Sequence, residues 1–192
     1  MSIFEKKIKV IIKNTINHLL KENVILYPTD TSWGIGGDSS SDLVVKKIFK
    51  LKKRNNKKAL ICLVSSIEML KRHVKKIPEK LINYINSDNP TTVIFENPKG
   101  FSPFLINSDN TIALRVTKNK FCKELIENFG KPIISTSANI SGEETPFKFE
   151  SINKSILNGV DFIVPLENKN LNQKVSRIIK LNKLNNIEFL RK

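Results

Sequence analysis

The chain is poor in the residues that mark several large functional classes. It has two cysteines, two histidines and one tryptophan among 192 residues. Two isolated cysteines, Cys62 and Cys122, form neither a metal-ligand pattern nor a disulfide framework. His18 and His73 both fall in amphipathic helical stretches, where we expect them on helix surfaces. The composition therefore predicts no metal site and gives no support to a Ser-His-Asp or Cys-His constellation.

Long apolar runs and Pro/Gly/Ser-rich tracts are also missing. No run approaches the roughly 20 apolar residues that a membrane-spanning helix needs. Residues 5–20 carry apolar residues at helical spacing with interleaved lysines, which is typical of an amphipathic helix and not of a signal peptide. We see no linker or repeat that would divide the chain. The sequence predicts a single domain over residues 1–192, located in the cytoplasm and not bound to a membrane.

Residues 27–38 form the first polar segment, Tyr-Pro-Thr-Asp-Thr-Ser-Trp-Gly-Ile-Gly-Gly-Asp, directly after a short apolar strand. Gly34, Gly36 and Gly37 permit positive φ, and we expect them to let backbone N–H groups approach an anionic ligand. The segment is neither a dinucleotide fingerprint nor a P-loop, because the third spaced glycine and the Gly-Lys-Ser/Thr are both absent. Alone, it is weak evidence for a site.

A second polar segment covers residues 131–142, where an apolar run ends in Ser-Thr-Ser-Ala-Asn-Ile-Ser-Gly. Open α/β sheets bind ligands at such strand ends, because the sheet holds an irregular loop in place. The alternative is a Ser/Thr/Asn turn that caps the next element. Taken alone, this composition favours neither interpretation.

Between these segments lies a basic cluster at the end of an amphipathic helix predicted over residues 42–53. Lys52, Lys53, Arg54 and Lys58 surround two asparagines. Such cations often only complement the carboxyl end of a helix in solvent. Between two hydroxyl-rich segments, however, they could also bind a triphosphate.

Together these residues resemble the Sua5/YciO/YrdC family of L-threonylcarbamoyladenylate synthases. The motifs that carry the likeness are residues 27–36, Lys52-Lys53-Arg54 with Lys58, the strand 112–116, the Ser-x-Ser-Ala-Asn-x-Ser-Gly of residues 135–142, and residues 175–179. They occur in the family's order and extend over residues 24–191. Many members carry a histidine at the position of Leu63, and the residue after Pro-Thr-Asp-Thr-Ser is Trp33 where tyrosine is usual.

The resemblance implies a reaction and a set of ligand-binding residues. L-threonine, bicarbonate or CO2, and ATP would give threonylcarbamoyl-AMP and pyrophosphate, and a separate tRNA threonylcarbamoyltransferase complex would then modify tRNA. The positions that match threonine-binding ones are Thr31, Arg115, Ser135 and Ser176. The positions that match ATP-binding ones are Arg54, Lys58, Thr111, Ser137, Thr145 and Arg191. Asn139, the amide of the motif, is expected either to organise the loop or to contact the nucleotide of ATP. Lys52, Arg54 and Lys58 are expected to stabilise the phosphates during catalysis, with Mg2+ arriving on ATP.

The alternation of helical and strand periodicities predicts an α/β fold. We expect helices at 5–20, 42–53, 67–74, 78–86, 120–129 and 150–158, and strands at 24–28, 59–64, 92–96, 111–116, 132–136, 161–164, 175–181 and 187–191. The resemblance implies a YrdC-like twisted mixed β-sheet with flanking helices and a large basic concave cleft.

A formal net charge of +15 offers a rival function. A basic concave surface could bind tRNA or double-stranded RNA through phosphate contacts without any synthase activity. Against this, the lysines are spread along the chain, and no aromatic RNA-recognition motif is present. The synthase is therefore the first hypothesis and an RNA-binding module the second.

Overall fold

The computed structural model describes residues 3–54, 60–166 and 175–192. Within these ranges the helices are α1 (Ile3–Leu20), α2 (Asp42–Leu51), α3 (Ile67–His73), α4 (Glu79–Asn86), α5 (Lys120–Phe129) and α6 (Lys154–Gly159), with 3-10 turns η1 (Pro103–Leu105) and η2 (Phe149–Ser151). The strands are β1 (Ile25–Pro28), β2 (Trp33–Gly36), β3 (Ile61–Val64), β4 (Thr91–Glu96), β5 (Thr111–Val116), β6 (Ile133–Ser137), β7 (Phe162–Ile163), β8 (Arg177–Leu181) and β9 (Ile187–Arg191). The predicted α/β class is confirmed.

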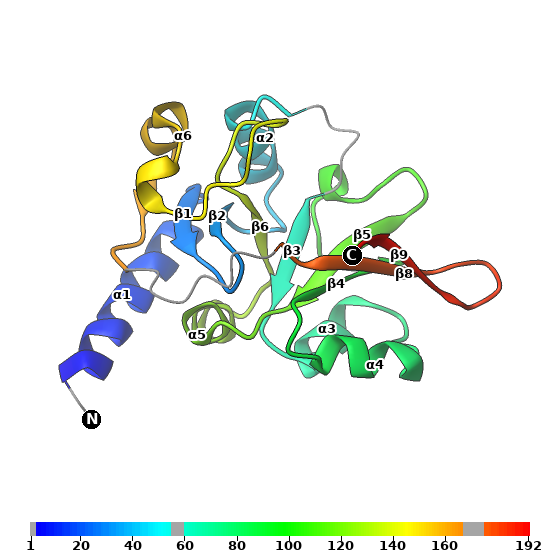
Figure 1. Ribbon diagram of the computed structural model, residues 1–192. Helices are drawn as coiled ribbons and strands as arrows, with labels where there is room; N and C mark the ends of the chain where they lie inside the picture. Colours follow the sequence, from blue (N-terminus) through cyan, green and yellow to red (C-terminus); the bar gives the residue numbers. More distant parts are fainter. Residues whose placement is uncertain (1–2, 55–59, 167–174) are drawn as a thin grey trace.

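The described strands form one mixed sheet in the order β7-β1-β2-β6-β3-β5-β4-β8-β9. The pairs β1/β7, β3/β5 and β4/β8 are parallel, and the remaining neighbours are antiparallel. Figure 1 shows the strong twist between the β1/β2 end and the β8/β9 end. Strand β6 lies between β2 and β3, so it joins the two parts of the sheet.

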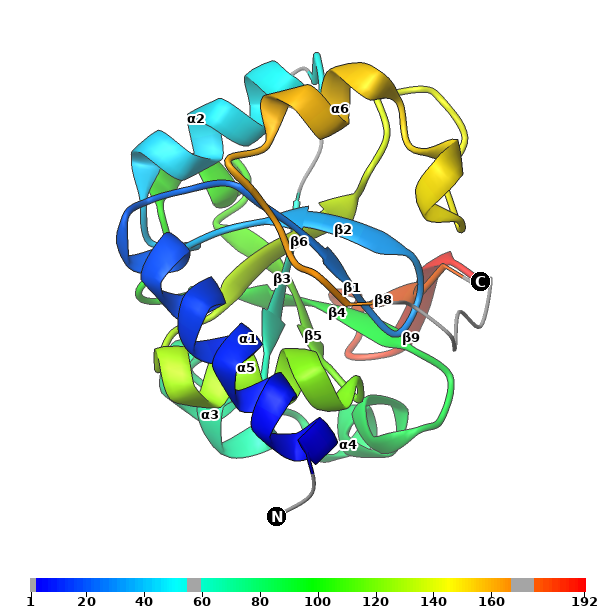
Figure 2. The ribbon, with the colours of Figure 1, turned by 90° about the vertical axis from the view of Figure 1, so that its left-hand side faces the viewer.

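Helices lie on both sides of this sheet. In Figures 1 and 2, α2 and α6 lie together above the sheet, whereas α1, α3, α4 and α5 lie below it. Helix α1 packs against α5, and α2 packs against α6. No helix in the ranges 3–54, 60–166 and 175–192 combines the length and apolar character that crossing a bilayer requires.

Local sequence signals account for most helix ends. The side chain of Asn119 accepts a hydrogen bond from the Cys122 backbone N–H and so caps the start of α5. Gly130 ends the same helix with a φ of 79°, a conformation that glycine adopts without the steric penalty of a Cβ. Ser41 caps α2 in the same way as Asn119 caps α5, through the Val44 N–H. These caps explain why the predicted helix bounds are close to the observed ones.

The glycine-rich segment after β1 differs from the expectation. Gly34, Gly36 and Gly37 do not have positive φ, and the first two belong to strand β2. A Cβ on Gly36 would lie 1.9 Å from the carbonyl oxygen of Ile134 on the neighbouring strand. Gly36 is therefore required for close packing of β2 against β6, and the predicted role of these glycines in a positive-φ ligand loop was wrong.

Candidate functional site

Strand register places the predicted ligand residues on one face of the sheet. Ser135 on β6 pairs with Ile61 on β3, which in turn pairs with Ala113 on β5. Side chains alternate along strands, so Ser137 and Thr111, each two residues away, share this face and one level of the sheet. Arg115 lies on the same face, four residues from Thr111, which is about 13 Å along a strand at the usual rise.

The register thus separates the predicted residues by ligand. The level of Ser137 and Thr111 contains positions that the resemblance implies for ATP, and the level of Arg115 contains positions that it implies for threonine. Ser135 lies between the two levels. We call these the nucleotide end and the amino-acid end of the candidate site.

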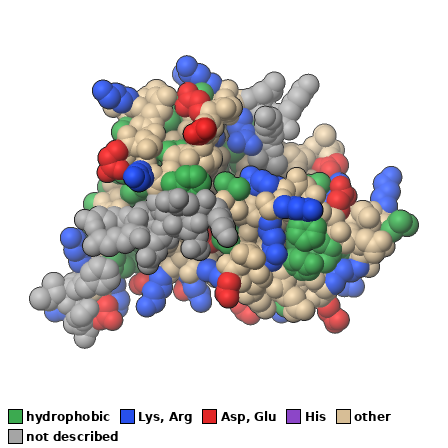
Figure 3. Space-filling model, viewed as in Figure 1, with side chains coloured by type: hydrophobic (Ala, Val, Ile, Leu, Met, Phe, Trp, Pro, Cys, Tyr) green, Lys and Arg blue, Asp and Glu red, His purple; other side chains and the backbone are tan. Residues whose placement is uncertain are grey.

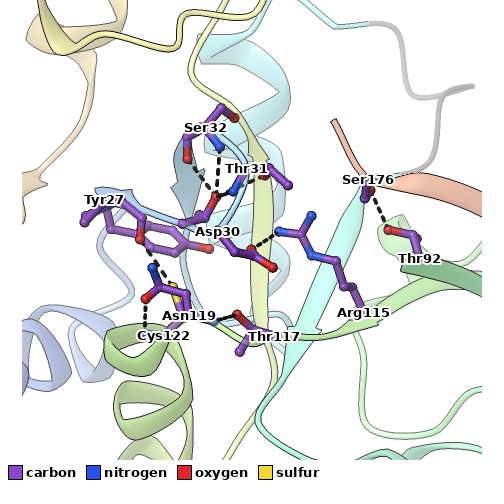
Figure 4. A network of polar contacts seen from close by, with 12 residues as sticks. Tyr27, Asp30, Thr31, Ser32, Thr92, Arg115, Thr117, Asn119, Cys122 and Ser176 are labelled. Carbon is purple, nitrogen blue, oxygen red and sulfur yellow. Dashed lines mark hydrogen bonds and ion pairs between the residues drawn. The ribbon is translucent and has the colours of Figure 1, made fainter. Parts of the chain in front are cut away.

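At the amino-acid end, the loop between β1 and β2 is fixed by one hydroxyl. The Thr29 Oγ1 atom donates to the Ser32 carbonyl at 2.7 Å and accepts from the N–H groups of Thr31 and Ser32 at 3.1 and 3.2 Å. It also lies 3.1 Å from the Thr31 hydroxyl. Figure 4 shows this loop facing Arg115, so the predicted threonine residue Thr31 is held beside the cation.

Arg115 is buried together with a carboxylate. Its side chain is 4% exposed, and its Nη2 atom lies 3.0 Å from Oδ1 of Asp30, which is 13% exposed. The Nε atom of Arg115 is buried and has no hydrogen-bond partner among the residues that the structure describes. Leu63, which pairs with Arg115 in the strand register, is fully buried and forms an apolar neighbour. A bound carboxylate could accept a hydrogen bond from this unused donor of the buried guanidinium.

On the other side of Arg115 lies a second polar group (Figure 4). The hydroxyls of Ser176 and Thr92 are 2.9 Å apart, and both side chains are buried. Arg191 donates to the Ser176 carbonyl at 2.7 Å through Nε and to its hydroxyl at 3.1 Å through Nη2. Burial lowers the pKa of Arg191, and the charge of Arg115 lowers it further. Arg191, matched to an ATP position, thus directly contacts a residue matched to threonine.

At the nucleotide end, Lys52 is 1% exposed and points into the Ser-x-Ser-Ala-Asn-x-Ser-Gly loop. Its Nζ donates to the carbonyls of Ser137 and Asn139, the latter at 2.7 Å, and to Asn139 Oδ1 at 3.1 Å. Its own carbonyl accepts from the Ser141 N–H at 2.8 Å. Burial and the charge of Arg54 lower the pKa of Lys52 to about 7. These contacts favour a role in shaping the loop over the predicted direct contact with phosphate.

The loop itself is closed by Asn139. Its Oδ1 accepts from the Ser137 hydroxyl at 2.6 Å, and its Nδ2 donates to the Glu143 carbonyl at 2.6 Å. Asn139 is buried, whereas Ser137 is partly accessible. Asn139 therefore organises the loop, and Ser137 is the more accessible of the two hydrogen-bonding side chains.

The remaining predicted residues occupy varied positions. Arg54 is half-buried just beyond α2, and burial lowers its pKa. The hydroxyl of Thr111 donates to Asp109 at 2.6 Å and accepts from Asn107 at 3.0 Å. Thr145 is half-buried in the segment after Glu143. Lys58 lies outside the described residues.

Sequence reasoning did not assign Thr29, Asp30 or Thr92 to the site. Asp30 and Thr29 stand inside the Pro-Thr-Asp-Thr motif, where an acidic residue among hydroxyls was a usable signal. Thr92 lies opposite Arg115 across the β4/β5 pair, because its neighbour Val93 pairs with Leu114 in an antiparallel register. Its contact with Ser176 joins residues 84 positions apart, which no local pattern reveals.

The fold and this geometry define a class of protein. It is an α/β protein that carries, on one face of a mixed sheet, a buried Arg–Asp pair at one level and a lysine-anchored polar loop at another. The first arrangement fits a small charged molecule, and the second fits an anion such as a phosphate chain.

Comparison with known proteins gives the family. The family model Sua5_yciO_yrdC, described as telomere recombination, matches residues 17–192. The threonylcarbamoyl-AMP synthase of Hahella chejuensis is 31% identical over 156 residues, which covers 80% of this chain and 85% of that protein. The synthase of Saccharophagus degradans is 36% identical over 129 residues, or 66% of this chain and 68% of that one. The chain therefore belongs to the Sua5/YciO/YrdC family.

Solved structures share the fold. Sua5 of P. abyssi complexed with L-threonine superposes with a TM-score of 0.83 at 24% identity, over 94% of this chain and 53% of that one. E. coli YciO gives a TM-score of 0.81 at 22% identity, over 96% and 89%. The chain thus spans about half the length of the P. abyssi protein. The predicted YrdC-like twisted mixed sheet is confirmed, and the basic concave cleft stays a prediction.

Proposed function

We propose that this protein is an L-threonylcarbamoyladenylate synthase, which forms threonylcarbamoyl-AMP and pyrophosphate from L-threonine, bicarbonate or CO2, and ATP. The family match and the synthase relatives support this assignment. The observation that carries it is the division of one sheet face into two levels, because the reaction must hold an amino acid and a nucleotide side by side.

The site suits a reaction in which a substrate supplies the nucleophile. The threonine amine takes up CO2, and an oxygen of the resulting carbamate attacks the α-phosphorus of ATP, so that pyrophosphate leaves. The protein then needs to align the two substrates and stabilise phosphoryl charge, and alignment alone can lower a barrier by roughly 7–11 kcal/mol. This chemistry uses no nucleophilic cysteine or hydroxyl of the protein.

At the amino-acid end, Arg115 would hold the threonine carboxylate through its planar fork. Thr31, Ser135 and Ser176 would supply hydroxyl contacts around it. The unpartnered buried Nε of Arg115 supports this role, because a carboxylate could accept from Nε and a terminal nitrogen together. The apolar Leu63 would then form part of the wall where many members place histidine.

At the nucleotide end, Arg54, Ser137 and Thr111 would contact ATP, with Arg191, Thr145 and Lys58 as the further predicted contacts. We assign Lys52 and Asn139 to shaping the loop that carries Ser137. The buried ammonium of Lys52 still contributes positive charge beneath the phosphates, which supports its predicted electrostatic part in catalysis.

Mg2+ would enter as the metal of the Mg-ATP substrate. The described residues contain no group of three His, Cys, Asp or Glu side chains that could hold a metal ion. The metal would therefore bind mainly to phosphate oxygens and neutralise charge on them. The transfer of threonylcarbamoyl to tRNA by a separate complex, and a cytoplasmic location, stay predictions.

The RNA-binding alternative rests on the net charge. Figure 3 shows Lys and Arg side chains at several places on the visible face, with Asp and Glu side chains among them. The synthase relatives also favour an enzyme. Direct contact with tRNA would be an additional property of the synthase and not its replacement.

One assay tests the proposed function. Purified protein with Mg-ATP, bicarbonate and L-threonine should release pyrophosphate, and the release should stop when threonine is omitted. Serine and allothreonine in place of threonine are the matched controls for the side chain. Threonine-independent pyrophosphate release, or none at all, would contradict the proposal.

A further inference from the structure

Among the described residues, Asp30 is the carboxylate that forms an ion pair with Arg115, and the proposed reaction has not yet used it. It lies in the loop between β1 and β2 and points at Arg115 across the amino-acid end of the site (Figure 4). Within the described ranges, Arg115 is the partner of its carboxylate, through Oδ1 alone. The second carboxylate oxygen of a side chain that is 13% exposed is therefore available to a ligand.

Burial makes this ion pair unlike a surface salt bridge. Taking two charges out of water is costly, and an excellent geometry with further hydrogen bonds is needed to offset that cost. Within residues 3–54, 60–166 and 175–192, the pair shares a single hydrogen bond of 3.0 Å, and the Arg115 Nε atom has no partner. Both charges thus keep unused hydrogen-bonding capacity, which a ligand of two opposite charges would fill.

The surroundings strengthen interactions at this point. Fully buried Leu63 pairs with Arg115 in the strand register, and fully buried Tyr27 and Cys122 lie on the Asp30 side of the ion pair (Figure 4). Burial raises the pKa of the Cys122 thiol, the charge of Asp30 raises it further, and the charge of Arg115 opposes this change. Charges at such a site interact more strongly than they do in bulk water.

We infer that Asp30 and Arg115 together recognise the zwitterion of a free α-amino acid, with Asp30 binding the α-ammonium group while Arg115 binds the α-carboxylate. An α-amino acid carries these two charged groups on one carbon atom, and the Asp30–Arg115 pair presents the two opposite charges side by side. Asp30 is then a specificity-determining residue: it selects an amino acid over a plain carboxylic acid of the same shape. This inference rests on the proposed function for the choice of threonine as the amino acid.

Asp30 would also discriminate against ligands that carry only a negative charge. Without an ammonium group, a carboxylate ligand would meet both Arg115 and the repulsion of Asp30. Once CO2 is attached to the amine, the new carbamate carboxylate would be repelled by Asp30 as well. It would therefore turn away from the β1–β2 loop, and the nucleotide end is the cationic side of the site.

The test compares three ligands by isothermal titration calorimetry. These are L-threonine, 3-hydroxybutyrate, which lacks the amino group, and 1-aminopropan-2-ol, which lacks the carboxylate. Wild-type protein should bind threonine at least about 10-fold more tightly than either analogue, because each analogue leaves one buried charge unpaired. Equal affinity for threonine and 3-hydroxybutyrate would overturn the inference, and this wild-type result needs no variant.

The variant Asp30→Asn keeps the oxygen that accepts from Arg115 and removes the charge. It should weaken threonine binding by about 10-fold or more while 3-hydroxybutyrate binds as well as before or better, since a repulsive charge is gone. Asp161→Asn, on the far side of β1, is the control for net charge and should change neither affinity. An equal loss for threonine and 3-hydroxybutyrate would mean that Asp30 only positions Arg115, and it would refute the inference.

The proposed function can fail separately. The wild-type protein could fail to bind threonine and still bind another α-amino acid, with an affinity that depends on the amino group and on Asp30. That result would support the zwitterion site and contradict the assignment of threonine as the substrate. If no α-amino acid binds, the inference falls with it.

Discussion

The two ends of the site hold a buried cation in different ways. At the amino-acid end, Arg115 is paired with the carboxylate of Asp30. At the nucleotide end, Lys52 is held by two backbone carbonyls and an amide oxygen. Both cations are almost fully removed from solvent. The first pair is close to neutral overall, whereas the second arrangement keeps its positive charge as long as Lys52 stays protonated.

This difference matches the charges of the two proposed ligands. A zwitterion carries no net charge and needs a positive and a negative partner, which the Arg115–Asp30 pair supplies. A triphosphate is an anion, and neutral carbonyl partners leave the ammonium charge of Lys52 uncancelled beneath it. The net charge at each end of the site thus depends on the partner of its buried cation.

The largest effect is expected from Lys52→Met, which removes the cation and its three hydrogen bonds. Among the described residues, the Asn139 carbonyl then loses its donor, whereas the Ser137 carbonyl and Asn139 Oδ1 each keep another one. An unpaired buried acceptor costs about 1–3 kcal/mol, and the loop that carries Ser137 also loses its charged contact, so we expect pyrophosphate release to fall by about 100-fold or more. If Lys52 shapes the loop, amide hydrogen exchange at residues 137–143 should rise in the absence of ATP. Exchange that changes only when ATP is bound would instead indicate direct phosphate contact.

The protonation of Lys52 should make the free energy of unfolding depend on pH. Its folded-state pKa is about 7, below the ordinary lysine value. Below pH 7 the Lys52 amine is protonated in both the folded and the unfolded state. Above pH 7 the unfolded state keeps this proton, whereas the folded state releases it. The contribution of Lys52 to the free energy of unfolding should therefore rise with pH, by about 2 kcal/mol between pH 7 and pH 9.

Urea unfolding at several pH values measures this rise, with Lys52→Met as the reference. The difference between wild type and variant should grow over that range. A constant difference would show that the ammonium form persists in the folded protein and that the carbonyl contacts outweigh burial.

Arg115→Lys should separate the two ends. It keeps the charge but loses the planar fork, so threonine affinity should fall by about 10–30-fold, in line with the loss of a charge-assisted hydrogen bond. ATP affinity should hold, because Ser137 and Thr111 lie at another level of the sheet and Arg191, the predicted nucleotide residue near Arg115, keeps its contacts with Ser176. Calorimetric titration of each ligand tests this, and equal losses for both would refute the division.

The smallest effects are expected from two serines on one strand. Ser135→Ala should raise KM for threonine and Ser137→Ala should raise KM for ATP, each by about 3–10-fold, as the loss of a neutral hydrogen bond predicts. Because the two changes are identical in chemistry and two residues apart, each is the control for the other. An exchange of the two effects would reverse the assignment of the ends.

Most of the fold could be predicted from periodicity and caps. Helix α5 was predicted over its full length because its apolar face and Gly130 are local signals. Strand β2 was not predicted as a strand, because its two glycines resemble a turn in sequence and only packing against Ile134 explains Gly36. Strand order and direction depend on contacts that no local pattern contains.

The sequence predicted which residues belong to the site better than it predicted the role of each residue. Family motifs brought out Lys52 and Arg115, but the burial of Lys52 comes from a loop about 85 positions further along the chain. The Asp30 partner of Arg115 is equally distant in sequence. Charge pairing across such separations is set by the sheet register, so a lysine in a basic cluster could not be recognised as a buried anchor.

Strand β6 has a consequence for how the protein becomes active. It pairs with β2 on one side and β3 on the other, and it ends in the loop that Lys52 holds. The site is complete only when β6 is inserted between β2 and β3, which lie about 100 and about 70 residues earlier in the chain. Contacts of such sequence separation form slowly. Catalytic competence should therefore be among the last properties to appear during refolding, well after most of the helical signal has been recovered.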